Sequence, residues 1–186
     1  MSNEIQKAGR HVPSVNIKAE GNGTAVGYTD AINMNMNIIM TDGTRNSLAC
    51  EYFNLIIGYD PFEKDYILVD RDRALTEYMS DEMKAEFGKL TPEVIDKIKK
   101  LPAIIAQEWD RTDEQQAIFA FIKDVKVQDN GVKIRYTKFF PIPFNFIREN
   151  LDELAVYLFE IYRTHWSIKH VDLLDVMQEK GLFPGK

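Results

Sequence analysis

The chain has 186 residues, of which 45% are apolar and 28% are charged. These values are ordinary for a folded globular domain, so they argue against extended disorder and against a fibrous repeat. The 29 acidic and 23 basic side chains give a net charge of −6. An acidic balance disfavours tight nonspecific binding of nucleic acid, because that binding depends on Lys and Arg side chains that neutralise phosphates.

Two further features of the sequence indicate the cellular compartment of the protein. No stretch approaches the ~18 uninterrupted apolar residues that span a bilayer, and the N-terminal residues lack the apolar core of a secretion signal. The single cysteine, Cys50, excludes an internal disulfide and a cysteine-rich zinc site. We therefore expect a cytoplasmic protein without a membrane partner.

The segment Ile32–Met40 alternates between apolar and asparagine side chains over most of its length. Isoleucine and methionine occupy every second position, and Asn33, Asn35 and Asn37 lie between them. A period of two predicts a half-buried strand, and Asp42-Gly43 after it is a turn signal. Asparagine is uncommon in strands, which leaves two interpretations. Either the asparagine side chains form a solvated face of a small sheet, or the segment is an edge strand that pairs with a partner or with an identical subunit.

The next elements follow from local patterns. Residues 46–58 place apolar side chains on one helical face with Gly58 at the end, although a strand over the apolar run 52–58 remains open. A short strand is expected at Tyr66–Val69, followed by two helices. The second helix has Thr91 as N-cap and Pro92 at its first position.

A hairpin is predicted around Asn130-Gly131, because both positions suit a two-residue turn with positive φ. This loop sets Val127 opposite Ile134 and Val125 opposite Tyr136, and sets Phe121 near Phe140. A third strand is expected at "PAIIAQEW", residues 102–109.

The hairpin carries the candidate binding residues Lys126, Lys133 and Arg135, which share its outward face. From Ala117 to Arg148 the chain has six basic and two acidic side chains, a local charge of 6 − 2 = +4. This face suits an acidic protein partner. Nucleic acid is the less favoured partner, since no outward aromatic side chain is expected for base stacking. An ordinary solvated sheet face is the competing interpretation.

The C-terminal third is expected to be helical. Apolar residues from Ile147 to Ile161 step by four, three, four and three, which predicts one helix. A last helix is expected over about Ile168–Lys180, with Ser167 as N-cap and Gly181 just past its end.

His165, His170 and Asp172 raise the question of a metal site, since three donors lie within eight positions. Residues five positions apart do not share a helical face, whereas metal-binding helices place histidines at i and i+4. The alternative is a packed junction in which Trp166 is buried and the two histidines point apart.

Asp70 and Asp72 follow the apolar strand in "ILVDRDRAL". Two carboxylates at a strand end can bind Mg²⁺. The stretch resembles the first motif of haloacid-dehalogenase-type phosphatases, and that resemblance implies Asp70 as nucleophile and Asp72 as general acid. The other interpretation is a solvated, self-paired charged turn that caps the next helix.

The sequence therefore predicts an α+β fold. We expect an antiparallel or small barrel-like sheet, an N-terminal strand-rich segment, a central helical pair and two C-terminal helices. We expect one compact unit over 1–186, with 1–61 and 62–186 as its sub-lobes. The favoured function is a non-enzymatic binding or interaction module without a cofactor, self-associating through the edge strand Ile32–Met40. The alternative is a phosphoryl-transfer enzyme that uses Asp70, Asp72 and Mg²⁺.

Overall fold

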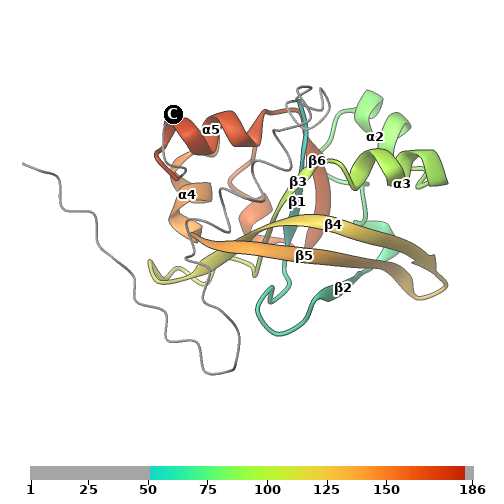
Figure 1. The fold of residues 1–186 in the computed structure, drawn as a ribbon, viewed down its shortest axis with the longest axis horizontal. Helices are drawn as coiled ribbons and strands as arrows, with labels where there is room; N and C mark the ends of the chain where they lie inside the picture. The colour runs from blue at the N-terminus through green and yellow to red at the C-terminus, as the bar shows by residue number, and fades with distance from the viewer. Residues whose placement is uncertain (1–50, 183–186) are drawn as a thin grey trace, which may run out of the picture.

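The computed structural model describes residues 51–182 as a mixed six-stranded sheet with short helices on both faces (Figure 1). The strand order is β2-β5-β4-β3-β1-β6. The strands are β1 (Phe53–Ile57), β2 (Tyr66–Val69), β3 (Pro102–Ala106), β4 (Gln116–Gln128), β5 (Gly131–Pro143) and β6 (His165–Lys169). The expected strand Ile32–Met40, with Asn33, Asn35 and Asn37, lies outside the described residues.

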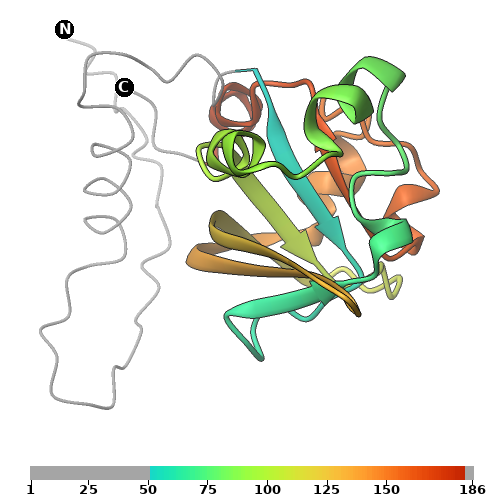
Figure 2. The same cartoon turned by 90° about the vertical axis from the view of Figure 1, so that its right-hand side faces the viewer.

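The prediction of an antiparallel sheet is wrong, because β1 and β3 are parallel neighbours. After β1 the chain forms β2 and two helices before it returns as β3, and a connection of this length allows the two strands to run in the same direction. The other strand pairs are antiparallel. The sheet curves into a half-barrel (Figure 2). The expected N-terminal strand-rich segment is also corrected, since only β1 precedes residue 61 in the described part of the chain.

Strand β1 replaces the helix expected up to Gly58. Every residue of Phe53–Ile57 is buried, because β1 lies between β3 and β6 and is covered on both faces. A strand buried on both faces has a continuous apolar sequence, which periodicity alone cannot separate from a short helix. Gly58 ends the strand with φ of +99°.

The central helical pair is confirmed. Helix α2 (Asp81–Phe87) begins after Ser80, and helix α3 (Pro92–Ile98) begins after Thr91. The Thr91 side chain accepts a hydrogen bond from the Val94 amide, as expected for an N-cap. Both helices pack on one face of the sheet through Phe87 and Ile98, which join a core that includes Trp166.

The hairpin is confirmed, but its register differs by two residues. The loop is Asp129-Asn130, and Val127 lies opposite Val132 rather than Ile134. Gly131 opens β5 beside β2 instead of forming the turn. A Cβ atom on Gly131 would lie 2.6 Å from the Val69 carbonyl oxygen, so glycine is needed for the close approach of β2. After two irregularities further along, Phe140 lies opposite Phe119 rather than the expected Phe121, which pairs with Thr137.

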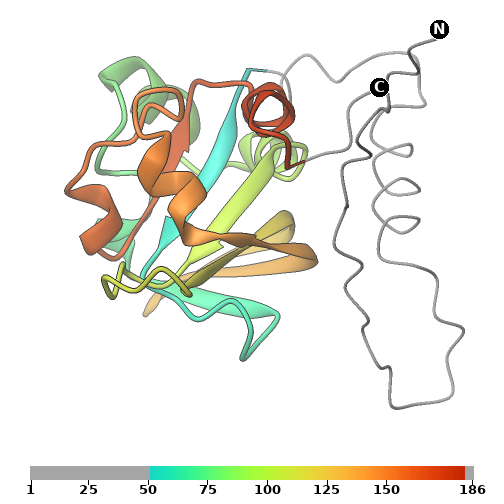
Figure 3. The same ribbon diagram turned by 90° about the vertical axis from the view of Figure 1, so that its left-hand side faces the viewer.

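The C-terminal third departs most from expectation. Helix α4 (Phe144–Glu149) ends at Asn150, whose side-chain amide donates to the Phe146 carbonyl, and Ala155 has a φ of +52°. These features prevent one helix over 147–161, and only the short 3₁₀ helix η3 (Glu160–Tyr162) follows. Figure 3 shows α4 and η3 on the face opposite α2 and α3.

Ser167 lies inside β6 rather than capping the last helix. Pairing with the central strand β1 favours the extended conformation of His165–Lys169 over helix. Helix α5 (Leu173–Glu179) begins later, and the Asp172 side chain accepts from the Asp175 amide as its N-cap. The expected burial of Trp166 is confirmed, with an exposed fraction of 0%.

Candidate interaction surfaces and a buried polar cluster

The structure separates the three predicted metal ligands. His165 is buried, whereas His170 is exposed and stacks on the Tyr52 ring at 4.6 Å between centroids. Asp172 caps α5. Within residues 51–182, no group of three His, Cys, Asp or Glu side chains could hold a metal ion.

Asp70 and Asp72 are exposed at the outer margin of the sheet. Asp70 precedes the short 3₁₀ helix η2 (Arg71–Arg73) and Asp72 lies within it, and the Asp70 side chain makes no capping hydrogen bond. Strand β2 before them is an edge strand antiparallel to β5, so the two carboxylates do not lie at the carboxyl edge of parallel strands. The exposed arrangement agrees better with a charged turn than with a phosphatase site.

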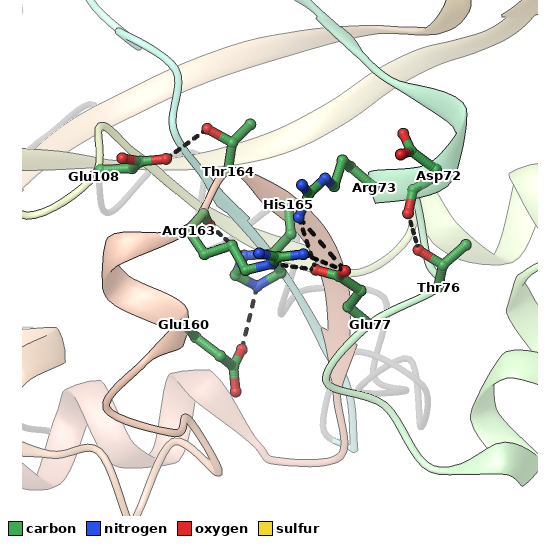
Figure 4. A network of polar contacts seen from close by, with 9 residues as sticks. All are labelled: Asp72, Arg73, Thr76, Glu77, Glu108, Glu160, Arg163, Thr164 and His165. Atoms are coloured by element: carbon green, nitrogen blue, oxygen red, sulfur yellow. Dashed lines mark hydrogen bonds and ion pairs between the residues drawn. The ribbon is translucent and has the colours of Figure 1, made fainter.

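A buried polar cluster lies on one face of β6, and it contains only one residue that the sequence analysis considered. Glu160, His165 and Lys169 are 0%, 0% and 3% exposed. Glu160 Oε1 accepts from Lys169 Nζ at 2.6 Å. Glu160 Oε2 lies 3.2 Å from His165 Nε2, as Figure 4 shows. Strand periodicity brings His165 and Lys169 to the same face, and η3 brings Glu160 to them.

The contacts of His165 limit where protons can lie on its ring and on the Glu160 carboxylate. His165 Nδ1 lies 2.7 Å from the Arg163 carbonyl oxygen, which only accepts, so Nδ1 carries a proton. In a neutral ring, Nε2 would then be unprotonated, and it would face a carboxylate oxygen although both atoms only accept hydrogen bonds. A second proton on the ring, or a proton on Glu160, satisfies both contacts. Burial lowers the pKa of Lys169, and Glu160 opposes that shift.

This cluster is shielded from solvent in the described structure. Its side chains are buried, and Tyr78 covers His165 with ring centroids 4.8 Å apart. Ser167 lies between His165 and Lys169 on the strand, yet its hydroxyl has no hydrogen-bond partner among residues 51–182. The described structure therefore shows no hydroxyl–imidazole pair of the kind that activates a serine nucleophile.

An ion-pair network covers the end of β6 next to this cluster. Arg163 donates to both carboxylate oxygens of Glu77 at 2.7 and 2.8 Å, and Arg73 Nη1 lies 3.3 Å from the same carboxylate (Figure 4). The hydrogen bond from Arg163 is the largest cause that lowers the pKa of Glu77. Thr164 donates to Glu108 at 2.7 Å on the other side.

The segment that carries Glu160 also exposes a group of large apolar side chains, which we call the aromatic surface. It consists of Tyr157 (66% exposed), Leu158 (51%), Phe159 (76%) and Tyr162 (37%). The Glu160 carboxylate accepts from the Tyr157 amide at 2.9 Å, so the buried cluster fixes the backbone of this surface. The Trp109 ring extends it beyond Tyr162, with centroids 5.5 Å apart.

The predicted basic face exists, and strand β2 adds to it. Lys126 lies opposite Lys133 on the β4–β5 hairpin, and Arg135 lies opposite Tyr66 of β2. The Lys133 ammonium lies 4.3 Å from the centre of the Tyr66 ring. We call Tyr66, Leu68, Lys126, Lys133 and Arg135 the basic face. The outward aromatic side chain that the hairpin lacks comes from a strand about 60 residues earlier in the chain.

Sequence reasoning missed the buried cluster and the aromatic surface. Both depend on η3 and β6, where one helix up to Ile161 and a second from about Ile168 had been expected. One usable signal was the run "VYLFEIY", residues 156–162, which holds more large apolar side chains than one buried helical stripe can accommodate.

Two further results concern membrane-spanning helices and similarity to known proteins. No helix in the described part of the chain is long and apolar enough to cross a bilayer. No protein-family model, no curated protein and no solved structure matches this chain.

Proposed function

We propose that this chain is a non-enzymatic protein-binding module that associates with a second copy of itself through the aromatic surface. The observation that carries the proposal is that Tyr157, Leu158, Phe159 and Tyr162 are all exposed within six consecutive positions of the chain. Single exposed apolar residues are common, whereas a contiguous group of them marks an interaction site. Tyrosine is also enriched among the residues that dominate binding energy.

The surface is held in place before any partner binds. The hydrogen bond from Tyr157 N to Glu160, and the contacts of Glu160 with His165 and Lys169, fix the segment in one conformation. Binding by a preorganised surface avoids the entropic cost of ordering a loop. This arrangement explains why a buried carboxylate supports an exposed segment.

The charges around the aromatic surface favour a second copy as the partner. Arg163, which follows Tyr162, pairs with Glu77, and the Arg111 guanidinium lies 5.9 Å from the centre of the Tyr162 ring. A two-fold contact brings each patch against itself, so a border that contains both signs lets a cation of one copy face a carboxylate of the other. A partner of single charge would match this border less well.

The expected dimer is weak. Burying the exposed part of each side chain contributes ~1–2 kcal/mol. The association cost of ~4–15 kcal/mol offsets much of this gain. We therefore expect a dissociation constant in roughly the micromolar to millimolar range.

Sedimentation velocity over ~1 µM to ~1 mM tests the proposal. We expect the average mass to rise with concentration and Phe159→Ser to remove the rise. Phe62→Ser is the matched control, since Phe62 is 50% exposed on the loop before β2. A strict monomer over this range, or an equal effect of the two substitutions, would overturn the proposal.

Pairing of Ile32–Met40 with the same segment of a second copy remains a separate proposal, supported by its alternating sequence. Met36→Lys distinguishes the two routes. If this segment carries the association, Met36→Lys abolishes the concentration dependence and Phe159→Ser does not. A cytoplasmic location and a single compact unit are parts of the same proposal.

A further inference from the structure

The outer edge of β2 offers backbone hydrogen-bonding groups without a partner among residues 51–182. Strand β2 is the last strand on its side of the sheet. The Tyr136 amide donates to the Asp65 carbonyl at 3.1 Å, which makes Asp65 and Tyr136 a hydrogen-bonded pair. Hydrogen-bonded and non-hydrogen-bonded pairs alternate in antiparallel strands, so the backbone groups of Tyr66 and Leu68 point away from β5.

The opposite edge of the sheet is closed, which makes the open edge a distinctive feature. Beside β6, Ala74 forms a parallel bridge with Trp166, and the Leu75 amide donates to the Trp166 carbonyl at 2.8 Å. Lys169 Nζ donates to the Tyr78 carbonyl further along. The segment 74–78 therefore covers β6, while β2 has no such cover within the described residues.

Two cations, Lys64 and Lys133, lie next to the open edge, and Lys64 also pairs with Glu63, with Nζ and Oε1 3.8 Å apart. The ammonium groups of Lys133 and Lys64 lie 4.3 and 6.0 Å from the centre of the Tyr66 ring, so both lean over β2. Lys126 and Arg135 lie on the same outward face of the hairpin. Asp124, opposite Arg135, is a carboxylate on that face. Every second side chain of an added strand would point to the same face of the sheet as Tyr66. Those side chains would lie within reach of Lys64 and Lys133.

We propose that the outer edge of β2 binds an extended acidic segment of another protein by β-strand addition. Backbone hydrogen bonds to Tyr66 and Leu68 supply affinity, and carboxylates at alternate positions of the added strand meet Lys64, Lys133 and Arg135. The same lysines disfavour pairing of β2 with β2 of a second copy, because like charges would then lie side by side. This binding is independent of self-association through the aromatic surface.

Fluorescence anisotropy on the full chain tests the proposal with three labelled probes. The first probe is a peptide of alternating Glu and Thr, the second is its Lys and Thr counterpart, and the third is single-stranded polyuridine. We expect the acidic peptide alone to bind, and its affinity to fall as salt rises. Tighter binding of polyuridine, or equal binding of the two peptides, would overturn the proposal.

Two changes separate strand addition from simple charge attraction. N-methylation of alternate amides of the acidic peptide removes donors to β2 without changing its charge, and we expect a loss of about tenfold or more in affinity. Leu68→Pro removes an outward N–H group from β2 and should act in the same direction. Unchanged affinity after N-methylation would overturn strand addition.

Charge-reversal variants locate the binding surface. Lys133→Glu should weaken the acidic peptide by about tenfold or more, because it replaces attraction by repulsion next to the open edge. Lys100→Glu is the matched control, since it makes the same change at the exposed end of α3. Equal losses in the two variants would show that the peptide responds only to net charge and would contradict binding at β2.

Discussion

Glu160 and Lys169 form a buried ion pair in which Oε1 and Nζ are 2.6 Å apart. The pair joins η3 to β6, and the same carboxylate holds the Tyr157 amide and contacts His165. One carboxylate thus connects the interior of the fold with the aromatic surface. The strength of this connection is the first property to test.

Glu160→Gln should destabilise the protein strongly. The substitution leaves Lys169 with a buried charge that has lost its counter-charge, and breaking a buried pair in this way costs ~3–5 kcal/mol. Urea unfolding followed by circular dichroism measures the loss. Glu153→Gln is the control, because Glu153 pairs with Lys180 at the surface, and it should leave the unfolding midpoint unchanged.

The double variant Glu160→Gln with Lys169→Met removes both charges. We expect it to recover much of the stability that Glu160→Gln loses, because no unpaired charge remains. If the double variant is as unstable as the sum of the single variants, the two side chains do not act as a pair.

Alkaline pH should weaken the fold through Tyr136. Burial is the largest cause that raises the pKa of Tyr136 from 10.0 to about 12, and its hydroxyl donates to the Lys64 carbonyl at 2.8 Å. Its folded-state pKa exceeds its unfolded-state pKa, so the stabilisation is complete below pH 10 and is lost as pH rises toward 12.

Absorbance at the tyrosinate band together with denaturant unfolding between these pH values checks this prediction. Tyr136→Phe should flatten the decline in unfolding free energy, since it removes the titrating hydroxyl. An identical decline in the wild type and in Tyr136→Phe would contradict the assignment.

Gly131→Ala should displace β2. The added Cβ atom would lie 2.6 Å from the Val69 carbonyl, at a φ of +147° that only glycine adopts readily. We expect a loss of ~1–3 kcal/mol in the free energy of unfolding. Binding of the acidic peptide should fall as well. Thr137→Ala, at an exposed position of the same strand, is the control for both measurements.

Millimolar Mg²⁺ should leave the melting temperature unchanged. Asp70 and Asp72 are exposed, and the described residues offer no third ligand close to them. Ligand binding to the folded state alone would raise the melting temperature. A rise that Asp70→Asn abolishes would instead support the phosphoryl-transfer alternative.

Local chemistry predicted the elements that depend on neighbouring residues. Thr91 and Pro92 determine the start of α3, and the polar turn between β4 and β5 determines the hairpin. The exact loop could not be predicted, because Gly131 is needed for close contact with the Val69 backbone, and Val69 is far away in the sequence.

Elements that depend on tertiary pairing could not be predicted. β1 is buried on both faces, so its mostly apolar run carries no strand periodicity. β6 does alternate polar and apolar residues, but five residues are too few to outweigh the helical pattern that follows. His165 and Lys169 share one face of β6, and Glu160 reaches them only because a 3₁₀ turn precedes the strand.

The most direct test of self-association places a photoreactive benzoyl-phenylalanine at position 159 and, as control, at position 62. The account predicts a crosslinked dimer from position 159, with the crosslink mapped by mass spectrometry to residues 157–162 of the second copy. It predicts little dimer from position 62. Absence of a dimer from position 159 at concentrations near ~1 mM, or a crosslink mapped elsewhere, would contradict association through the aromatic surface.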